Sequence, residues 1–286
     1  TDVTFSGFAT PAANTASIGF VTGAANDSQG TFTLAAAVSG GDSGGSIRFS
    51  SAGVVADSAA NQNTQTVAVS VQSLQSTWKA GNATTVWSTD GNWVEGVAPS
   101  AGSVVVIPDG ASPYPVLDAS VFLEQLTVET NASLTLGNFD ITIGAGGLSN
   151  AGTIVVNGSG SIDKVDIAKG TVRYTTTGRQ LLDFGITDYY NLEIDGAGQS
   201  YTVGAALAVA GTLTVTDAGS VTFAYPLTAA SMVVAASACD IAFNAGAGQT
   251  STVTTAVTFL NTGTLTFGDD AGDTITFAGG DRKSVV

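Results

Sequence analysis

Short runs in which apolar and polar residues alternate follow one another along most of the chain. The clearest series lies within residues 169–215, with strand-like runs at residues 172–174, 192–194, 201–203 and 213–215. Two or three apolar residues at i, i+2 spacing suit a strand with one buried face. Such a unit cannot bury that face alone, so it needs another copy stacked on it.

The same kind of run continues to the end of the chain. The segment G-T-L-T-V at residues 211–215 returns as G-T-L-T-F at residues 263–267. Strand-like runs recur roughly every eight to eighteen residues, so two or three runs per turn give a coil of roughly 20–30 residues, within the range of solenoid proteins. We therefore expect an all-β chain with a parallel β-helix, or β-solenoid, over residues 76–286.

Phenylalanines recur within the C-terminal runs of this pattern. The positions concerned are Phe223, Phe243, Phe259, Phe267 and Phe277. They predict an internal ladder of stacked rings. In a different register the same burial would give scattered core phenylalanines, and the sequence leaves both arrangements open.

Residues 1–75 differ from the remainder of the chain. Runs with strand character alternate there with turn clusters such as P-A-A-N and S-G-G-D-S-G-G. This pattern is typical of a small antiparallel β-sandwich. The sequence starts inside one such run, so we expect an incomplete sandwich with an open edge, which a neighbouring subunit would complete.

All three tryptophans of the chain, Trp78, Trp87 and Trp93, lie close together after this segment. A solenoid needs a cap because its terminal coil would otherwise expose apolar surface. Three indoles within residues 76–110 suit such an N-terminal cap. The alternative is a surface cluster that binds glycans by stacking sugar rings on the indoles.

The motifs that follow Trp78 resemble a known class of proteins. They are N-W-x-x-G-x-x-P at residues 92–99, V-x-I-P at residues 105–108, P-Y-P-V-L at residues 113–117 and L-E-Q-L-T-V at residues 123–128. In these motifs the chain is similar to secreted bacterial β-helix surface proteins of the filamentous-haemagglutinin-like, adhesin type. The resemblance covers residues 78–215 best. It implies an adhesive or scaffolding role, with no catalytic residues to carry over.

Charged residues make up 11% of the chain and are mostly acidic, with a formal net charge of −15. Phosphate recognition requires clustered Lys and Arg, so nucleic acid is excluded as a partner class. No apolar run approaches the length of a membrane helix, so we expect no membrane insertion. An acidic surface suits an extracellular, salt-rich or calcium-bearing environment. The single cysteine, Cys239, fits a small buried hydrophobe, with a reactive thiol as the alternative.

Four of the eight basic residues fall in one short stretch. They are Lys164, Lys169, Arg173 and Arg179. A basic patch on an otherwise acidic rod would dock onto the acidic face of a neighbouring copy. The alternative is a solvated surface without a partner.

Residues with catalytic potential form no recognisable constellation. The segment G-D-S-G-G at residues 41–45 matches the surroundings of the nucleophile in trypsin-like proteases, but the chain has no histidine to act as general base. Parallel β-helices also include polysaccharide lyases and hydrolases, which use paired carboxylates or a basic residue. The candidates for such an enzyme are Asp183, Asp188, Glu193 and Asp195, near Arg179. No motif singles them out, and we expect no enzymatic activity.

Metal binding has one candidate site. The absence of histidine and the single cysteine argue against zinc. Calcium takes oxygen ligands, and Asp269, Asp270 and Asp273 in G-D-D-A-G-D-T are the best candidates. They match neither an EF-hand nor a glycine-rich nonapeptide repeat, so a solvated acidic turn is the alternative. We expect no other cofactor.

The coil pattern and two ends that look unfinished predict a non-enzymatic, extracellular structural or adhesive surface protein. Head-to-tail contacts between copies would build a filament. Partners would be further copies, other surface components or glycans. The alternative function is that of a carbohydrate-binding or carbohydrate-active β-helix protein.

Overall fold

The structure is a computed structural model of the chain. It describes residues 75–283 with breaks at residue 82, residues 176–187, residues 244–247 and residue 270. Within the first 74 residues it describes the backbone of five strands. Across these described residues the chain is all-β, as predicted.

The five N-terminal strands pair antiparallel. They are β1 (Val3–Ser6), β4 (Ser46–Phe49) and β5 (Val69–Ser70) in one sheet, and β2 (Ala16–Phe20) with β3 (Gly30–Leu34) in another. The packing of these sheets into a sandwich, its open edge and the G-D-S-G-G segment at residues 41–45 involve residues outside the described ones.

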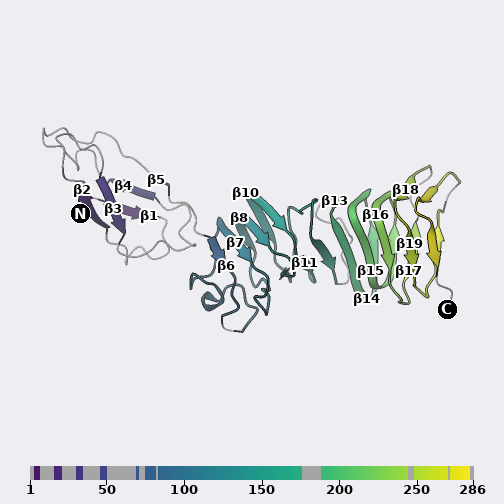
Figure 1. Cartoon of the computed structure of the whole chain (residues 1–286), viewed down its shortest axis with the longest axis horizontal. Coiled ribbons are helices and arrows are strands. Elements are labelled where there is room, and N and C mark those ends of the chain that lie inside the picture. The colour runs from purple at the N-terminus through teal and green to yellow at the C-terminus, as the bar shows by residue number, and fades with distance from the viewer. Residues whose placement is uncertain are drawn as a thin grey trace.

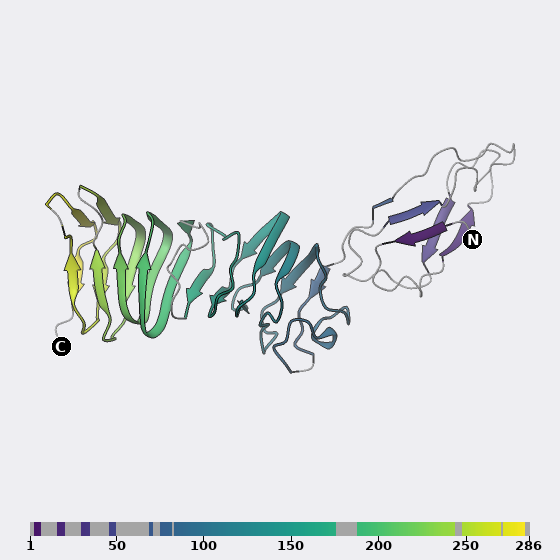
Figure 2. The same ribbon diagram turned by 180° about the vertical axis from the view of Figure 1, so that it is seen from behind.

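From residue 75 onward the named strands pair in parallel, which confirms the β-solenoid. In Figure 1 and Figure 2 these strands lie side by side along one axis, each coil following the previous one. The elements are β6 (Gln75–Thr77), η2 (Asp90–Asn92, a 3-10 turn), β7 (Ser103–Ile107), β8 (Val121–Val128), β9 (Ser133–Thr135), β10 (Ile141–Asn150), β11 (Thr153–Val156), β12 (Thr171–Tyr174), β13 (Asp188–Tyr189), β14 (Asn191–Val203), β15 (Leu207–Phe223), β16 (Leu227–Val234), β17 (Asp240–Phe243), β18 (Thr250–Val253), β19 (Val257–Phe259), β20 (Leu265–Phe267), β21 (Thr274–Phe277) and β22 (Asp281–Lys283).

Each coil contributes to three faces of the rod. The first face contains β6, β7, β13, β18 and β21, the second contains β9, β11, β12, β19 and β22, and the third contains β17 and β20. The longer strands turn from one face to the next. Register shifts mark the corners, for example between Gly196 and Ser200 in β14. The two to three strand runs per coil predicted by the sequence are therefore observed.

The coils lengthen along the rod. Ser133 pairs with Thr153, and Thr171 pairs with Asn191, which are spacings of 20 residues. Nearer the C-terminus, β18 and β21 pair at a spacing of 24 residues, Thr250 with Thr274. These spacings fall at the lower end of the predicted coil length.

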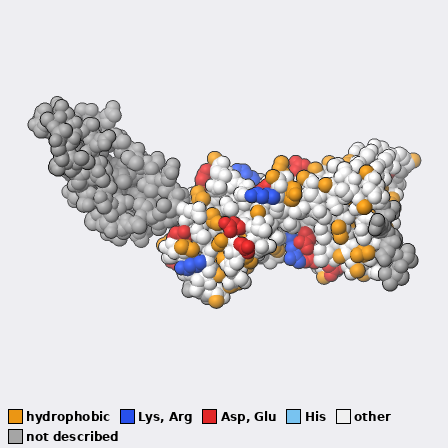
Figure 3. Space-filling model, in the orientation of Figure 1, with side chains coloured by type: hydrophobic (Ala, Val, Ile, Leu, Met, Phe, Trp, Pro, Cys, Tyr) orange, Lys and Arg blue, Asp and Glu red, His pale blue; other side chains and the backbone are white. Residues whose placement is uncertain are grey.

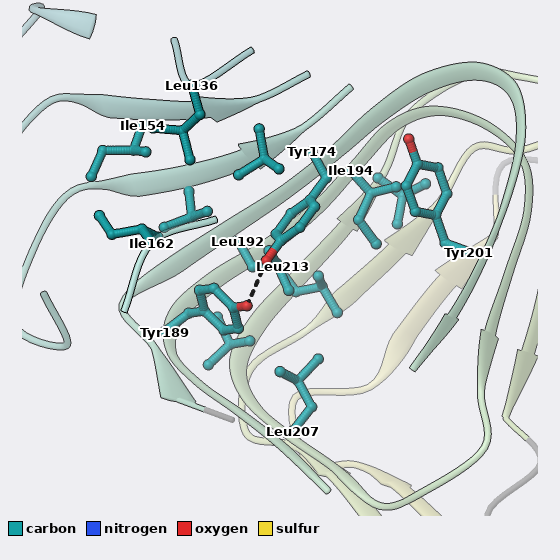
Figure 4. Close-up of a cluster of buried hydrophobic side chains, with 14 of the residues drawn as sticks. Leu136, Ile154, Ile162, Tyr174, Tyr189, Leu192, Ile194, Tyr201, Leu207 and Leu213 are labelled. Atoms are coloured by element: carbon teal, nitrogen blue, oxygen red, sulfur yellow. Dashed lines mark hydrogen bonds between the residues drawn. The ribbon is translucent and has the colours of Figure 1, made fainter. Parts of the chain in front are cut away.

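Inward positions of successive coils stack to make one continuous core. On the second face a stack of side chains that are at most 4% exposed consists of Leu134, Ile154, Val172, Leu192, Leu213, Met232 and Val257. Figure 4 shows part of this core, where the hydroxyls of Tyr174 and Tyr189 hydrogen bond at 2.9 Å. Burial, together with Tyr174, raises the pKa of Tyr189 well above its usual value. Each coil thus buries the apolar side of its neighbour, as the stacking argument requires.

The phenylalanine ladder is confirmed in part. Phe223, Phe243 and Phe267 occupy one position of successive coils on the third face, and their rings stack with centroids 5.1 and 5.8 Å apart. Phe259 and Phe277 belong to the second and first faces and contact these rings edge-on. The stacked ladder therefore has three rungs, because the corners of the coil distribute the five rings over different faces.

Candidate functional site

The three tryptophans close the N-terminal end of the solenoid core. Trp78 and Trp93 are fully buried, and Trp87 is 2% exposed. Edge-to-face contacts join Trp93 to Trp78 and to Trp87, with ring centroids 5.1 and 4.8 Å apart. The indole N–H of Trp78 donates to the carbonyl of Pro113 at 3.0 Å, and that of Trp93 donates to the carbonyl of Trp87 at 2.8 Å.

Hydrogen bonds attach this tryptophan cap to the first coil. The backbone N–H of Thr77 donates to the carboxylate of Glu95 at 2.8 Å, and the buried side chain of Asn92 donates to the carbonyl of Val86 at 2.9 Å. A sugar ring needs an exposed aromatic face for stacking. The structure buries all three indoles, so it places the glycan candidates Trp78, Trp87 and Trp93 in the core.

Many carboxylates join one coil to the next. Those that accept a hydrogen bond from the backbone N–H of a residue 16 to 30 positions away are Glu95, Asp118, Glu124, Glu129, Asp140, Asp163, Asp166 and Asp240. We call these eight the coil-joining carboxylates. A hydrogen bond to an ionised acceptor is stronger than one between neutral groups. These acidic residues therefore help to fix the register between coils.

Asp240 shows the electrostatic consequence. Its carboxylate accepts the backbone N–H of Thr264 at 2.6 Å and the hydroxyl of the same residue at 2.7 Å. Both bonds favour the charged form and lower the pKa of Asp240 below its usual value. Asp240 is the single charged residue between Ala218 and Gly268, and its carboxylate is bound within the coil.

The basic residues predicted as a docking patch are partly engaged within the chain. Arg173 forms an ion pair with Asp195 and lies 3.6 Å from Glu193. The hydrogen bond with Asp195 is the main cause that raises the pKa of Arg173. Lys169 is exposed, and Arg179 lies outside the described residues.

Lys164 also bridges two coils. Its ammonium donates to the carbonyls of Ile143 and Gly144, both at 2.7 Å. Lys164 and Arg173 thus both stabilise neighbouring coils of their own chain. Docking onto another copy through this patch stays a prediction.

The carboxylates considered for polysaccharide chemistry lie on two faces. Glu193 and Asp195 flank Arg173 on the second face, and the hydroxyl of Thr216 donates to Glu193 at 2.9 Å. Asp188 is exposed on β13 of the first face. Asp183, the fourth candidate, lies outside the described residues. The ion pair gives Glu193 and Asp195 a structural use in joining β12 to β14.

The calcium candidates lie in a turn between β20 and β21. The backbone N–H of Asp269 donates to the carboxylate of Asp273 at 3.1 Å. Asp270 is outside the described residues. Within the part of the chain that the structure describes, no group of three or more acidic, cysteine or histidine residues has a geometry suited to a metal ion. Calcium binding by the three aspartates stays a prediction.

Cys239 is fully buried, as predicted for a small hydrophobe. Burial raises the pKa of its thiol to about 11, with smaller contributions from Asp240 and Asp217. Because the thiolate is the reactive form, this thiol is shielded from chemical modification.

Charge is unevenly distributed along the solenoid, a feature that the residue-by-residue search for sites missed. In Figure 3 blue and red side chains gather over its N-terminal part, whereas its C-terminal part is mostly white and orange. The large apolar side chains exposed in the stretch with a single charge are Tyr225, Val233, Leu260 and Phe267. The signal is present in the sequence as a long interval with one charged residue.

Comparison of the chain with protein-family models, with curated proteins and with solved structures returns no match. In the described part of the chain, no helix is long and apolar enough to cross a membrane.

Proposed function

We propose that the chain is a non-enzymatic structural or adhesive protein of an extracellular surface, which works as a rod and associates with further copies of itself. The observation that carries this proposal is the continuous core of stacked coils. Coils about 4.8 Å apart form a stiff, quasi-one-dimensional scaffold whose outer faces are long and regular. Such a shape suits spacing, scaffolding or adhesion over an extended area.

The use of polar side chains supports the same function. The coil-joining carboxylates, Arg173 and Lys164 are bound to neighbouring coils of the same chain. Their contribution is therefore to the regularity of the rod. The carbohydrate alternative loses the exposed indoles on which it was based, since the tryptophans are buried.

The tryptophan cap bears on how copies would associate. A head-to-tail contact in which one bare coil stacks directly on another would require Trp78 and Trp93 to leave the core. Exposing two large buried aromatic side chains costs several kcal/mol, on the order of 2–3 kcal/mol for each. We therefore favour contacts through the sides of the rod over direct stacking of the first coil.

Imaging and solution mass test this proposal together. The full chain is examined by negative-stain electron microscopy and light scattering over a wide concentration range, with and without calcium. We expect elongated particles that associate as concentration rises, and no new reducing ends or unsaturated products after incubation with polysaccharides. Monomers alone under every condition would argue against self-association, and polysaccharide cleavage would argue for the enzyme.

A further inference from the structure

We propose that two copies of this chain associate side by side, in antiparallel orientation, through the outer surface of the second face. This inference rests on the proposed self-association and names its contact surface. The surface is a row of positions that follow one another in register from coil to coil: Glu193, Thr214, Val233, Thr258 and Arg282. We call it the Val233 row.

Exposure of apolar side chains marks the centre of this surface. Val233 in β16 is 39% exposed, and Leu260, just after β19, is 38% exposed. Beside the Val233 row runs a parallel row of small residues that includes Thr212 and Ser231, which are paired in register. Small side chains around exposed aliphatic ones let a second flat sheet approach to a typical packing distance of about 10 Å.

Net charge limits where two copies can meet. The chain carries −15, so two copies repel one another wherever their acidic parts come close. The middle of the Val233 row belongs to the stretch from Ala218 to Gly268, where Asp240 is the single charged residue. Asp240 lies on the third face in β17 and is bound by Thr264. Contact at Val233 therefore brings few like charges together.

The order of charges along the row selects the orientation. A two-fold axis that lies parallel to the strands and passes over Val233 reverses the row in the second copy. Glu193 of one copy then faces the partner's Arg282, and Val233 faces its own equivalent. A parallel arrangement would instead place Glu193 against its equivalent and Arg282 against its equivalent, which is unfavourable. A two-fold contact between identical patches is also the commonest form of homodimer.

A charge placed on the axis tests the contact surface. Val233→Lys puts two ammonium groups opposite each other at the centre, whereas Thr222→Lys introduces the same charge on the third face in the same stretch. By sedimentation equilibrium we expect the wild type and Thr222→Lys to reach twice the 28.3 kDa chain mass and Val233→Lys to remain monomeric. Circular dichroism verifies that both variants are folded.

The outcomes separate this inference from the proposed function. If Val233→Lys associates as strongly as the wild type, the protein self-associates through another surface, and the Val233 row is wrong. If the wild type is monomeric at all concentrations, the proposed self-association fails together with the row.

Cross-linking tests the symmetry without depending on a disruptive substitution. In Val233→Cys the new thiols lie at the axis, so a short bismaleimide should join two chains, while Cys239 is fully buried. Thr222→Cys is the matched control and should give little cross-linked dimer. Equal cross-linking of both variants would overturn the proposed contact.

The antiparallel order is tested at Arg282. In that orientation Arg282→Glu places a carboxylate opposite Glu193, and we expect the association constant to fall about tenfold. In the parallel arrangement the same substitution only exchanges one like-charged pair for another. An unchanged association constant would therefore overturn the antiparallel orientation.

Discussion

Residues 75–170 and residues 188–280 wind with the same topology but hold their coils together with different side chains. The first region contains the tryptophan cap and all the coil-joining carboxylates except Asp240. The second region contains the stacked rings of Phe223, Phe243 and Phe267. Its coils are also longer, with spacings of 24 residues near the end.

This contrast relates internal bonding to the outer surface. Coils joined through carboxylates carry negative charge at their corners, so the surface of the first region is well solvated and repels other copies. Coils joined through stacked aromatic rings need no charge outside. The second region can therefore present the nearly uncharged surface around Val233, which is where we place contact with another copy.

Loss of the central indole should have the largest effect and should strike the first region. Trp93→Ala removes a fully buried side chain that contacts Trp78 and Trp87, and we expect a loss of about 3–5 kcal/mol in the free energy of unfolding. Urea unfolding measures the loss, and hydrogen exchange should show it mainly within residues 75–170. Val94→Ala, at a neighbouring position that is 58% exposed, is the control. Similar unfolding of the two variants would show that the cap does not secure this end.

A close contact at a corner of the second region gives the next effect. A Cβ added at Gly196 would overlap the Tyr201 hydroxyl, so Gly196→Ala should cost about 1–3 kcal/mol in the free energy of unfolding. The Tyr201 hydroxyl is buried and has no hydrogen-bond partner among the described residues. Tyr201→Phe alone should therefore be neutral or stabilising.

Combining the two substitutions tests the cause. Tyr201→Phe should restore a substantial part of the stability lost in Gly196→Ala, as measured by a double-mutant cycle in urea. Additive effects would show that the hydroxyl and the added methyl group do not meet, and would contradict the corner geometry.

Removing a coil-joining carboxylate should have a smaller effect. Asp166 accepts the backbone N–H of Asn150 at 3.0 Å and that of Ala168 at 2.9 Å. Asp166→Ala leaves these donors without the carboxylate and should cost about 1–2 kcal/mol in thermal or urea unfolding. Asp188→Ala, which removes an exposed carboxylate on β13, should change stability by less than about 0.5 kcal/mol. Equal losses would mean that the bonds to the backbone contribute nothing specific.

Alkaline pH should weaken the second region through small contributions. Burial raises the pKa of Tyr201 to about 12 and that of Cys239 to about 11, from usual values of 10.0 and 9.0. Folding therefore favours the neutral forms, and their contribution is complete below pH 9 and is lost as the pH rises through 11 and 12. Urea midpoints at pH 7, 9 and 11 should fall less for Tyr201→Phe than for the wild type. Parallel curves for the two proteins would contradict this assignment.

Acid pH acts in the opposite direction. The lowered pKa of Asp240 means that its contribution is present above the usual carboxylate pKa and is lost as the pH falls through the lowered value. Asp240→Asn should therefore flatten the acid limb of the stability curve.

The local features of the fold could be predicted because they depend on neighbouring residues. The runs at residues 172–174, 192–194 and 213–215 lie in β12, β14 and β15, since an inward residue at every second position is a local property. The prediction of a cap from the cluster around Trp78 agrees with the burial of all three indoles.

Features that depend on the register between coils could not be predicted. Asp140 binds Ser161 and Asp240 binds Thr264, at separations of 21 and 24 residues, so no fixed repeat identifies both pairs. The variable coil length also hid which phenylalanines share a face, and Phe259 was wrongly placed in the stacked ladder. The Val233 row was missed for the same reason.

The distance between two outer positions six coils apart tests the continuous solenoid most directly. Register connects Thr135 to Thr258 through Val155, Arg173, Glu193, Thr214 and Val233. Spin labels on cysteines at Thr135 and Thr258, in protein diluted with unlabelled chain, should give one narrow distance near about 29 Å by pulsed electron resonance, six times the spacing of about 4.8 Å. A broad distribution, or a distance well beyond about 45 Å, would contradict one rod of stacked coils.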